Sequence, residues 1–380
     1  GYAFAQRRAS QNAADFAELR PPGEARVRVT SPAGRRAGRT AIEILAADQP
    51  FIVDTVRLVL RRRGQHELVL LHPLLAIERD LDGGIESLGR ASVPRTRESY
   101  VYAEIHTLDD ANECERLEPE LRRALAEARR VVGDHAAMLA RLREHATRIE
   151  SCADALSGAG ERARNLAEMF RWLESEGFLF MGYRRYAVQR EAGGYRVSLE
   201  PSSALGILAE VDDSRFDDAD PTTPVPALVA SRRDDERVIF FDETRNDSTV
   251  HRRGRLDSVS VKLLDERARV IGFGRFVGLL TNRAMRMRPS ALGILAARRA
   301  RVVEALGTEP GSHTHKLALE AYDCLPLEFL LPAQLEDVRR VVASVVSAAE
   351  LSQIEVVSVA DPENRSFFVS VVLPRRAYEE

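Results

Sequence analysis

Residues 40–64 read TAIEILAADQPFIVDTVRLVLRRRG, and this stretch decides the fold of the N-terminal part of the chain. Thr40–Ala46 is a short apolar run that predicts a β-strand. Asp48 follows as a candidate helix cap, and Pro50 suits the first helical turn. Phe51–Arg63 carries apolar side chains at helical spacing, and the glycine that ends the stretch suits a helix C-terminus. The stretch therefore predicts a strand that leads directly into an amphipathic helix.

The flanking sequence supplies the other elements of one domain. Ala25–Thr30 alternates valine with arginine, which predicts a strand. Glu67–Glu78 is a long apolar strand, and Tyr100–Ile105 has a period of two. Leu117 and the apolar residues that follow it at helical spacing mark an amphipathic helix. The order is β-α-β-β-α, with Ala25–Thr30 as a fourth strand. This order indicates an α+β fold with a ferredoxin-like split βαβ sheet and its helices on one face.

A second β-rich region predicts an antiparallel sheet. Phe178–Val188 and Tyr195–Leu199 are expected to form a hairpin, followed by a short helix at Ser203–Val211 and an irregular loop at Phe216–Pro226. Three further strands are expected at Val238–Phe241, Leu256–Leu264 and Val270–Leu280. Two strands, irregular or helical residues and then three strands is the order of a PAS-like sensory domain.

The C-terminal region predicts the order β-α-β-β. A helix at 290–306 and a Gly/Pro/His linker precede the expected strand Leu327–Leu331, helix Gln334–Ala349 and strands Ile354–Ala360 and Phe367–Leu373. A closing helix and fourth strand are missing from this order. We therefore expect an exposed strand edge or face in this region, and a longer parent polypeptide.

Length, charge and cysteine content limit the class of protein. The chain has 380 residues, enough for two or three domains, and its formal net charge of -3 gives no reason to expect nucleic acid as a partner. It has no run of about 18 apolar residues, so we expect no membrane segment. Cys114, Cys152 and Cys324 lie far apart without a CxxC pair, which favours a cytoplasmic protein without a disulfide or zinc framework.

Lysine is almost absent from the chain. Only Lys262 and Lys316 are lysines, and the other 53 of the 55 basic residues are arginines, as a GC-rich genome would produce. A Schiff base or a lysine general base needs a lysine in a shaped pocket. The chain therefore offers only two candidates for the chemistry of an amino-acid dehydrogenase.

Two motifs resemble binding sites for a dinucleotide or a metal. Gly272, Gly274 and Gly278 form a GxGxxxG pattern, but a dinucleotide fingerprint needs a helix after its glycines, and a strand is predicted here. Strand bulges or close backbone approach explain these glycines better. His313 and His315 have no third ligand nearby, and we expect them in an exposed linker. We predict no catalytic residue, cofactor site or metal site.

The turn from Asp48 to Val53 is a candidate ligand site. A strand that leads into a helix leaves the first helical amides free, and both these amides and the helix dipole favour an anion such as a carboxylate. The candidate residues are Asp48, Pro50, Phe51, Ile52 and Val53. The alternative is an ordinary capped helix start with no ligand.

Many short motifs, in order along almost the whole chain, resemble the N-terminal segment of the large bacterial NAD-specific glutamate dehydrogenases. They are Arg20–Gly23, Val27–Val29, Asp48–Val56, His72-Pro73, Arg97–Ser99, Gly182–Tyr186, Leu205–Leu208, His251, Leu256-Asp257, Val261-Lys262, Arg275-Phe276, Gly278-Leu279, Gly311–His313 and Val371–Tyr378. The sequence departs from the family pattern at Gln49, Ser258, Ser260, Phe273 and Leu325–Leu327, which affects the choice of ligand more than the fold.

The resemblance implies a string of ACT-like domains with a PAS-like domain among them. The implied organisation is a helical lead-in at 1–23, an ACT-like domain at 24–135, a helical connector at 136–159, a PAS-like domain at 160–285, a helix and linker at 286–314 and an incomplete second ACT-like domain at 315–380. ACT domains commonly bind amino acids at the turn that corresponds to Asp48–Val53.

The resemblance also implies a function. This segment would be a non-catalytic, allosteric and oligomerisation part of an oxidoreductase that deaminates L-glutamate to 2-oxoglutarate with NAD. Its partners would be its own catalytic region, further copies in a tetramer or hexamer, and an amino-acid effector. The alternative is a free-standing amino-acid-sensing ACT/PAS regulator.

Overall fold

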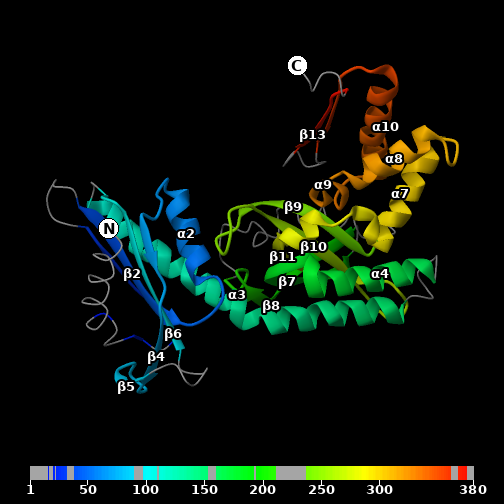
Figure 1. Ribbon diagram of the computed structural model, residues 1–380. Helices are drawn as coiled ribbons and strands as arrows, with labels where there is room; N and C mark the ends of the chain where they lie inside the picture. Colours follow the sequence, from blue (N-terminus) through cyan, green and yellow to red (C-terminus); the bar gives the residue numbers. More distant parts are fainter. Residues whose placement is uncertain are drawn as a thin grey trace. The chain divides into compact units, whose positions relative to one another are not determined.

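The computed structural model describes Phe16 and residues 20–21, 23–31, 38–89, 97–108, 111–152, 160–191, 194–210, 237–360 and 367–374. The chain divides into two compact units, which are described separately (Figure 1). The first unit comprises Gly1–Asp134 and Ser248–Gly254, and the second comprises His135–Asp247 and Arg255–Glu380.

The first unit is built on an antiparallel sheet. Its strands are β1 (Arg26–Thr30), β2 (Arg39–Ala47), β3 (Val69–Leu71), β4 (Leu74–Arg79), β5 (Ile85–Gly89) and β6 (Arg97–His106). The order is β1-β2-β6-β4-β5, and β3 also pairs with β6. The first strand in sequence thus lies beside the second, where a split βαβ domain has its fourth strand. The predicted antiparallel α+β arrangement of these elements is confirmed, while β5 was not predicted.

The predicted strand Glu67–Glu78 is interrupted. β3 and β4 pair with β6 in one continuous register, from Val69 opposite Glu104 to Ala76 opposite Arg97. Pro73 lies at the interruption, where it has no N–H to donate but accepts a hydrogen bond from the Tyr100 amide at 3.1 Å. The predicted strand is therefore present as two short strands, β3 and β4, which both pair with β6.

Two helices cover one face of this sheet, as predicted. Helix α2 (Ile52–Arg62) and the first part of α3 (Ala111–Ser151) pack apolar residues against β2 and β6. The helices contribute Ile52, Val56, Val59, Leu60, Leu117, Leu121 and Leu125, and the strands contribute Ile42, Ile44, Val101, Ala103 and Ile105. The helix predicted in the connector at 136–159 is present as far as Ser151, as a continuation of α3 without a break at Gly133. The helical lead-in implied at 1–23 lies largely outside the described residues.

The opposite face of the first sheet combines aromatic rings with buried ion pairs. Phe16 packs near Tyr100, with 6.4 Å between the ring centroids. The Tyr100 hydroxyl donates a hydrogen bond to Glu43, and Arg28 forms an ion pair with the same carboxylate. Glu98 is likewise paired with two arginines. Each buried carboxylate thus has a cationic partner, as burial of a charge requires.

The second unit contains a five-stranded antiparallel sheet. Its strands are β7 (Phe178–Glu191), β8 (Gly194–Gly206), β9 (Ile239–Asp247), β10 (Arg255–Leu264) and β11 (Val270–Leu280), in the order β8-β7-β11-β10-β9. All five strands lie where strands were predicted. The short helix predicted at Ser203–Val211 is wrong, because β8 continues to Gly206, which turns the chain with φ 62°.

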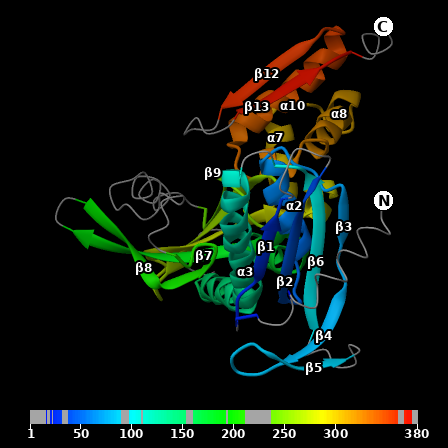
Figure 2. The ribbon, with the colours of Figure 1, turned by 90° about the vertical axis from the view of Figure 1, so that its left-hand side faces the viewer.

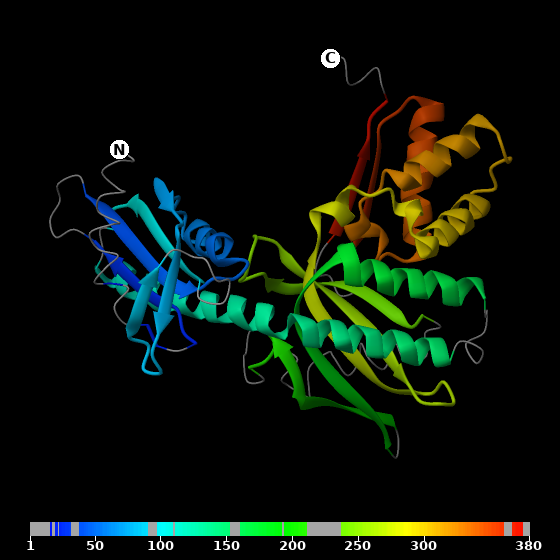
Figure 3. The same cartoon turned by 60° about the horizontal axis from the view of Figure 1, so that its bottom comes forward.

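One face of this sheet is covered by helices. The C-terminal part of α3, helix α4 (Glu161–Trp172) and the short helical turn η2 (Leu173–Gly177) precede β7 (Figure 3). Met138, Leu142 and Leu166 from the helices share one apolar core with Phe180 and Phe276 from the strands. No helix in the described part of the chain is both long and apolar enough to cross a membrane.

The C-terminal region packs into the same core. It contains α6 (Asn282–Arg286), the short 3-10 turn η4 (Pro289–Ala291), α7 (Gly293–Ala305), α8 (His313–Asp323), α9 (Leu327–Leu330), α10 (Leu335–Leu351), β12 (Glu355–Ala360) and β13 (Phe367–Val372). Helices α7 and α10 and both strands were predicted. The strand predicted at Leu327–Leu331 is wrong, because these residues form α9, with Pro326 at its N-cap position.

The expected exposed face in the C-terminal region is present. Strands β12 and β13 form a hairpin that packs on α10 (Figure 2). Alternate side chains face away from the core, and Val356 and Phe367 are 62% and 77% exposed. This chain thus presents an apolar strand surface to solvent, a feature that stable sheet proteins usually cover.

Candidate functional site

The predicted ligand turn has a different local structure from the expected cap. Helix α2 begins at Ile52, and its N-cap residue is Phe51, in the left-handed conformation with φ 73° and no side-chain cap bond. The prediction that Asp48 caps this helix is therefore wrong, and Pro50 precedes the helix instead of lying in its first turn. The Asp48 carboxylate accepts a hydrogen bond from the Ser99 hydroxyl of β6 at 2.7 Å.

The first helical amides of α2 remain available for a ligand. No described residue accepts a hydrogen bond from the amides of Ile52, Val53 or Asp54. The first unit also includes His251, whose ring lies 5.1 Å from that of Phe51 and whose Nδ1 is 3.1 Å from the Asp54 carboxylate. The turn therefore combines unpaired N–H donors with one exposed carboxylate beside them.

A cavity of about 450 Å³ adjoins this turn at Gln49. Arg20, Arg122, Arg123 and Arg129 also line it, the last three from α3. Arg20 is already paired with Glu98 at 2.9 Å, while Arg123 is exposed. The sequence did not reveal this cavity, because arginines that lie far from the turn in sequence are indistinguishable from the many others in the chain.

The glycine pattern lies inside a strand, as predicted. Gly272, Gly274 and Gly278 all belong to β11, and the pairing register with β7 shifts between Val277 and Gly278. A Cβ atom at Gly278 would lie 2.0 Å from the Leu179 carbonyl oxygen, and one at Gly274 would lie 2.1 Å from His145 Nε2. Close packing and a bulge therefore explain these glycines, and the pattern is not a phosphate-binding turn.

The remaining candidates for chemistry lie apart from one another. Lys262 is buried in β10 with Nζ 5.8 Å from the Phe240 ring centroid, and Lys316 is exposed on α8. The linker expected around His313 and His315 is wrong, because these residues begin α8 and the Ser312 hydroxyl caps the helix. Across the described residues, no group of three or more His, Cys, Asp or Glu side chains is placed to hold a metal ion.

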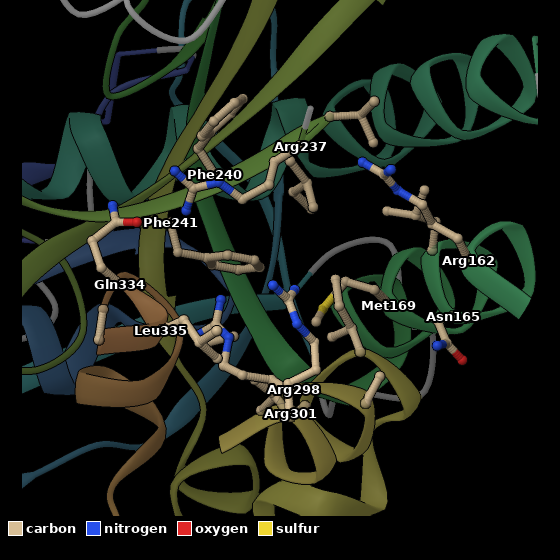
Figure 4. Close-up of a pocket in the computed structure, with 18 of the residues that line it drawn as sticks. Arg162, Asn165, Met169, Arg237, Phe240, Phe241, Arg298, Arg301, Gln334 and Leu335 are labelled. Carbon is tan, nitrogen blue, oxygen red and sulfur yellow. The ribbon is translucent and has the colours of Figure 1, made fainter. Parts of the chain in front are cut away.

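A larger cavity lies within the second unit, with a volume of about 690 Å³ (Figure 4). Arg162 of α4, Arg237 before β9, and Arg298 and Arg301 of α7 line it, and Figure 4 shows them around one space. Its apolar lining includes Leu166, Met169, Ile239, Phe240, Phe241, Leu295, Leu331 and Leu335. These residues come from α4, the start of β9, α7 and the start of α10, so the fold assembles the site from segments that are distant in sequence.

Comparison with known proteins shows what the chain is similar to. Residues 7–121 match the family described as "Glutamate dehydrogenase, ACT1 domain". The chain is 25% identical over 96% of its length to an NAD-specific glutamate dehydrogenase of Halomonas elongata, and covers 23% of that protein. It is 28% identical over 91% of its length to an NAD-specific glutamate dehydrogenase of Pseudomonas aeruginosa, and covers 21% of it. A Mycobacterium tuberculosis protein of the same name is 26% identical over 89% of the chain.

The chain thus spans about a fifth to a quarter of the length of the curated relatives it matches. The match to the ACT1 family covers most of the first unit, including β1, β2, α2 and β6. The predicted resemblance is confirmed by both kinds of comparison: residues 7–121 match the ACT1 domain of glutamate dehydrogenase, and almost the whole chain is similar to part of the NAD-specific glutamate dehydrogenases.

Proposed function

We propose that this chain is the non-catalytic regulatory and oligomerisation segment of a large NAD-dependent glutamate dehydrogenase. In the intact cytoplasmic enzyme, a separate catalytic region would bind NAD and convert L-glutamate to 2-oxoglutarate, ammonia and NADH. The observation that carries this proposal is the ACT1 match over residues 7–121, within a similarity that extends over 96% of the chain to a much longer relative.

The second unit would serve as a PAS-like sensory domain. Two strands precede and three strands follow the segment between Gly206 and Ile239, and the sheet order is β8-β7-β11-β10-β9. Neighbouring atoms fill the space beside the glycines of β11, and Lys316 is exposed on α8. These features support a regulatory role better than they support a dehydrogenase site.

An amino-acid effector would bind at the start of α2 in the first unit. Its carboxylate would accept hydrogen bonds from the amides of Ile52 and Val53, where the helix dipole also favours an anion. Asp54 lies in the same turn and would repel a bound carboxylate unless it faces the amino group of the ligand. Asp48 would act on the stability of the turn, because its carboxylate is already bonded to Ser99.

Titration of the purified chain with the common amino acids tests this proposal through its melting temperature. We expect at least one amino acid to raise the melting temperature, because a ligand that binds only the folded state stabilises it. Asp54→Asn should change the affinity for that amino acid several-fold by removing a charge beside the amides. Asp48→Ala should cost about 1 kcal/mol of stability with or without the ligand, through the lost Ser99 bond.

Glu115→Gln provides the matched control, since it removes an equally exposed acid on α3, away from the turn. It should leave the affinity unchanged. If no amino acid shifts the melting temperature of the wild-type chain, the sensing role of this turn is wrong and its role is structural.

A further inference from the structure

The cavity of the second unit is lined by both charged and apolar side chains. Arg298 and Arg301 lie on α7, one helical turn apart, and Arg237 precedes β9. Phe241 and Leu335 line the same space (Figure 4). Residues three apart on a helix lie on the same face, so α7 directs both guanidinium groups toward one region of the cavity.

Arg298 is the most constrained of these side chains. Its Nη1 donates a hydrogen bond to the Leu330 carbonyl oxygen, which holds the guanidinium at the cavity wall. Burial lowers the pKa of Arg298, Tyr322 opposes this shift, and the positive charges of Arg237 and Arg301 each lower the pKa further by less than Tyr322 raises it. Arg237 and Arg301 therefore lie close enough to Arg298 to repel it.

Glu161 also lines the cavity, from the start of α4. Among the described residues, no carboxylate forms an ion pair with Arg298 or Arg301. The neighbouring Arg299 differs, because it pairs with Asp323, which also binds Arg288 at 2.8 Å. Arg299 does not line the cavity, so α7 pairs with an acid the arginine outside the cavity and not the two arginines that line it.

We propose that this cavity binds a small organic anion that carries at least two phosphate or carboxylate groups. Guanidinium groups bind both kinds of oxyanion through paired hydrogen bonds, and the ligand would supply negative charge beside Arg298 and Arg301. The apolar side chains would contact the carbon skeleton of the ligand. A volume of about 690 Å³ lies within the usual range of about 300–1,000 Å³ for small-molecule sites.

Isothermal titration calorimetry on the purified 380-residue chain tests this proposal with four probes. Pyrophosphate and ADP represent phosphate ligands, and citrate and 2-oxoglutarate represent carboxylate ligands. We expect saturable binding of at least one probe with a stoichiometry near one, and weaker binding at high salt because the attraction is ionic. Binding by pyrophosphate and ADP alone identifies a phosphate ligand, and binding by the organic acids alone identifies a carboxylate ligand.

Two variants locate the binding in the cavity. Arg301→Gln and Arg298→Gln should each weaken binding at least about tenfold, because each removes a charged donor. Arg301 is exposed, so its variant remains informative even if Arg298→Gln does not fold. Arg164→Gln is the control, since Arg164 is an exposed residue of α4 outside the cavity lining and its loss should not change the affinity.

The proposal is overturned if none of the four probes binds. It is also overturned if Arg301→Gln binds the probe as tightly as the wild-type chain and Arg164→Gln do. Neither result bears on the amino-acid site at α2, which lies in the first unit and is tested with different ligands and variants.

Discussion

Replacing Arg79 with alanine is expected to lower the free energy of unfolding of the first unit by about 3 kcal/mol, at the lower end of the effect of breaking a buried ion pair. Arg79 binds both carboxylate oxygens of Glu98, from Nε at 2.7 Å and from Nη2 at 2.9 Å. The two side chains are only 8% and 5% exposed. The variant leaves the Glu98 carboxylate buried, with Arg20 as its remaining ion-pair partner among the described residues, so much of its desolvation cost is no longer offset. Urea unfolding followed by circular dichroism measures the change.

Arg57→Ala is the matched control for this variant. Arg57 also pairs with a glutamate, Glu67, but its side chain is 39% exposed, so its loss should cost about 1 kcal/mol or less. Burial raises the pKa of Glu98, but hydrogen bonds from Arg79 and Arg20 outweigh burial and hold the pKa below its usual value. The stabilisation is therefore present above that usual value and is lost as pH falls through the lower folded-state pKa. Equal losses for Arg79→Ala and Arg57→Ala would contradict the account.

Gly274→Ala is expected to destabilise the second unit by about 3 kcal/mol, the upper range for inserting a methyl group into a packed core. The new Cβ would lie 2.1 Å from His145 Nε2 and 3.1 Å from Tyr183 Cε2. His145 cannot move away freely, because its ring is buried and its Nε2 lies 3.0 Å from the Tyr183 hydroxyl. Burial also lowers the pKa of His145 to about 4, so the ring is neutral at pH 7.

A double-mutant cycle separates this clash from a general loss of strand structure. In a His145→Ala background, Gly274→Ala should cost much less than in the wild-type chain, because the atoms it would meet are gone. Gly133→Ala is the control in α3, where a Cβ meets nothing within 4 Å, and it should stabilise the helix by about 0.5–1 kcal/mol. An equal cost of Gly274→Ala in both backgrounds would show that His145 is not what excludes a side chain there.

The regular periodic segments were predictable because local sequence decides them. The helix after Phe51 buries one face, which its apolar spacing shows, whereas the strands at Thr40–Ala46 and around Tyr100 are buried on both faces and were recognised from their short apolar or alternating runs. The β11 assignment of the three glycines also followed from pattern, since apolar residues continue through them without a helix. These elements were enough to predict the antiparallel α+β fold of the first unit and the five strands of the second.

The wrong predictions arose where tertiary contacts override local preference. Asp48 suggests a helix cap, but Ser99, 51 residues away in sequence, binds its carboxylate. The run Leu327–Leu331 is too short for its period to distinguish strand from helix.

The candidate sites were only partly predictable for the same reason. The turn before α2 is local and could be recognised, although its cap could not. The arginine-lined cavity joins Arg162, Arg237 and Arg298, which only the folded sheet and helices bring together. In a chain with 53 arginines, no single arginine stands out in the sequence.

The most direct test of the central claim is the formation of NADH by the purified 380-residue chain in the presence of L-glutamate and NAD. A regulatory segment without its own active site should form no NADH above the rate without enzyme. Glutamate-dependent NADH formation that copurifies with the chain, and that Lys262→Ala or Lys316→Ala abolishes, would contradict the account and identify a catalytic site in this chain.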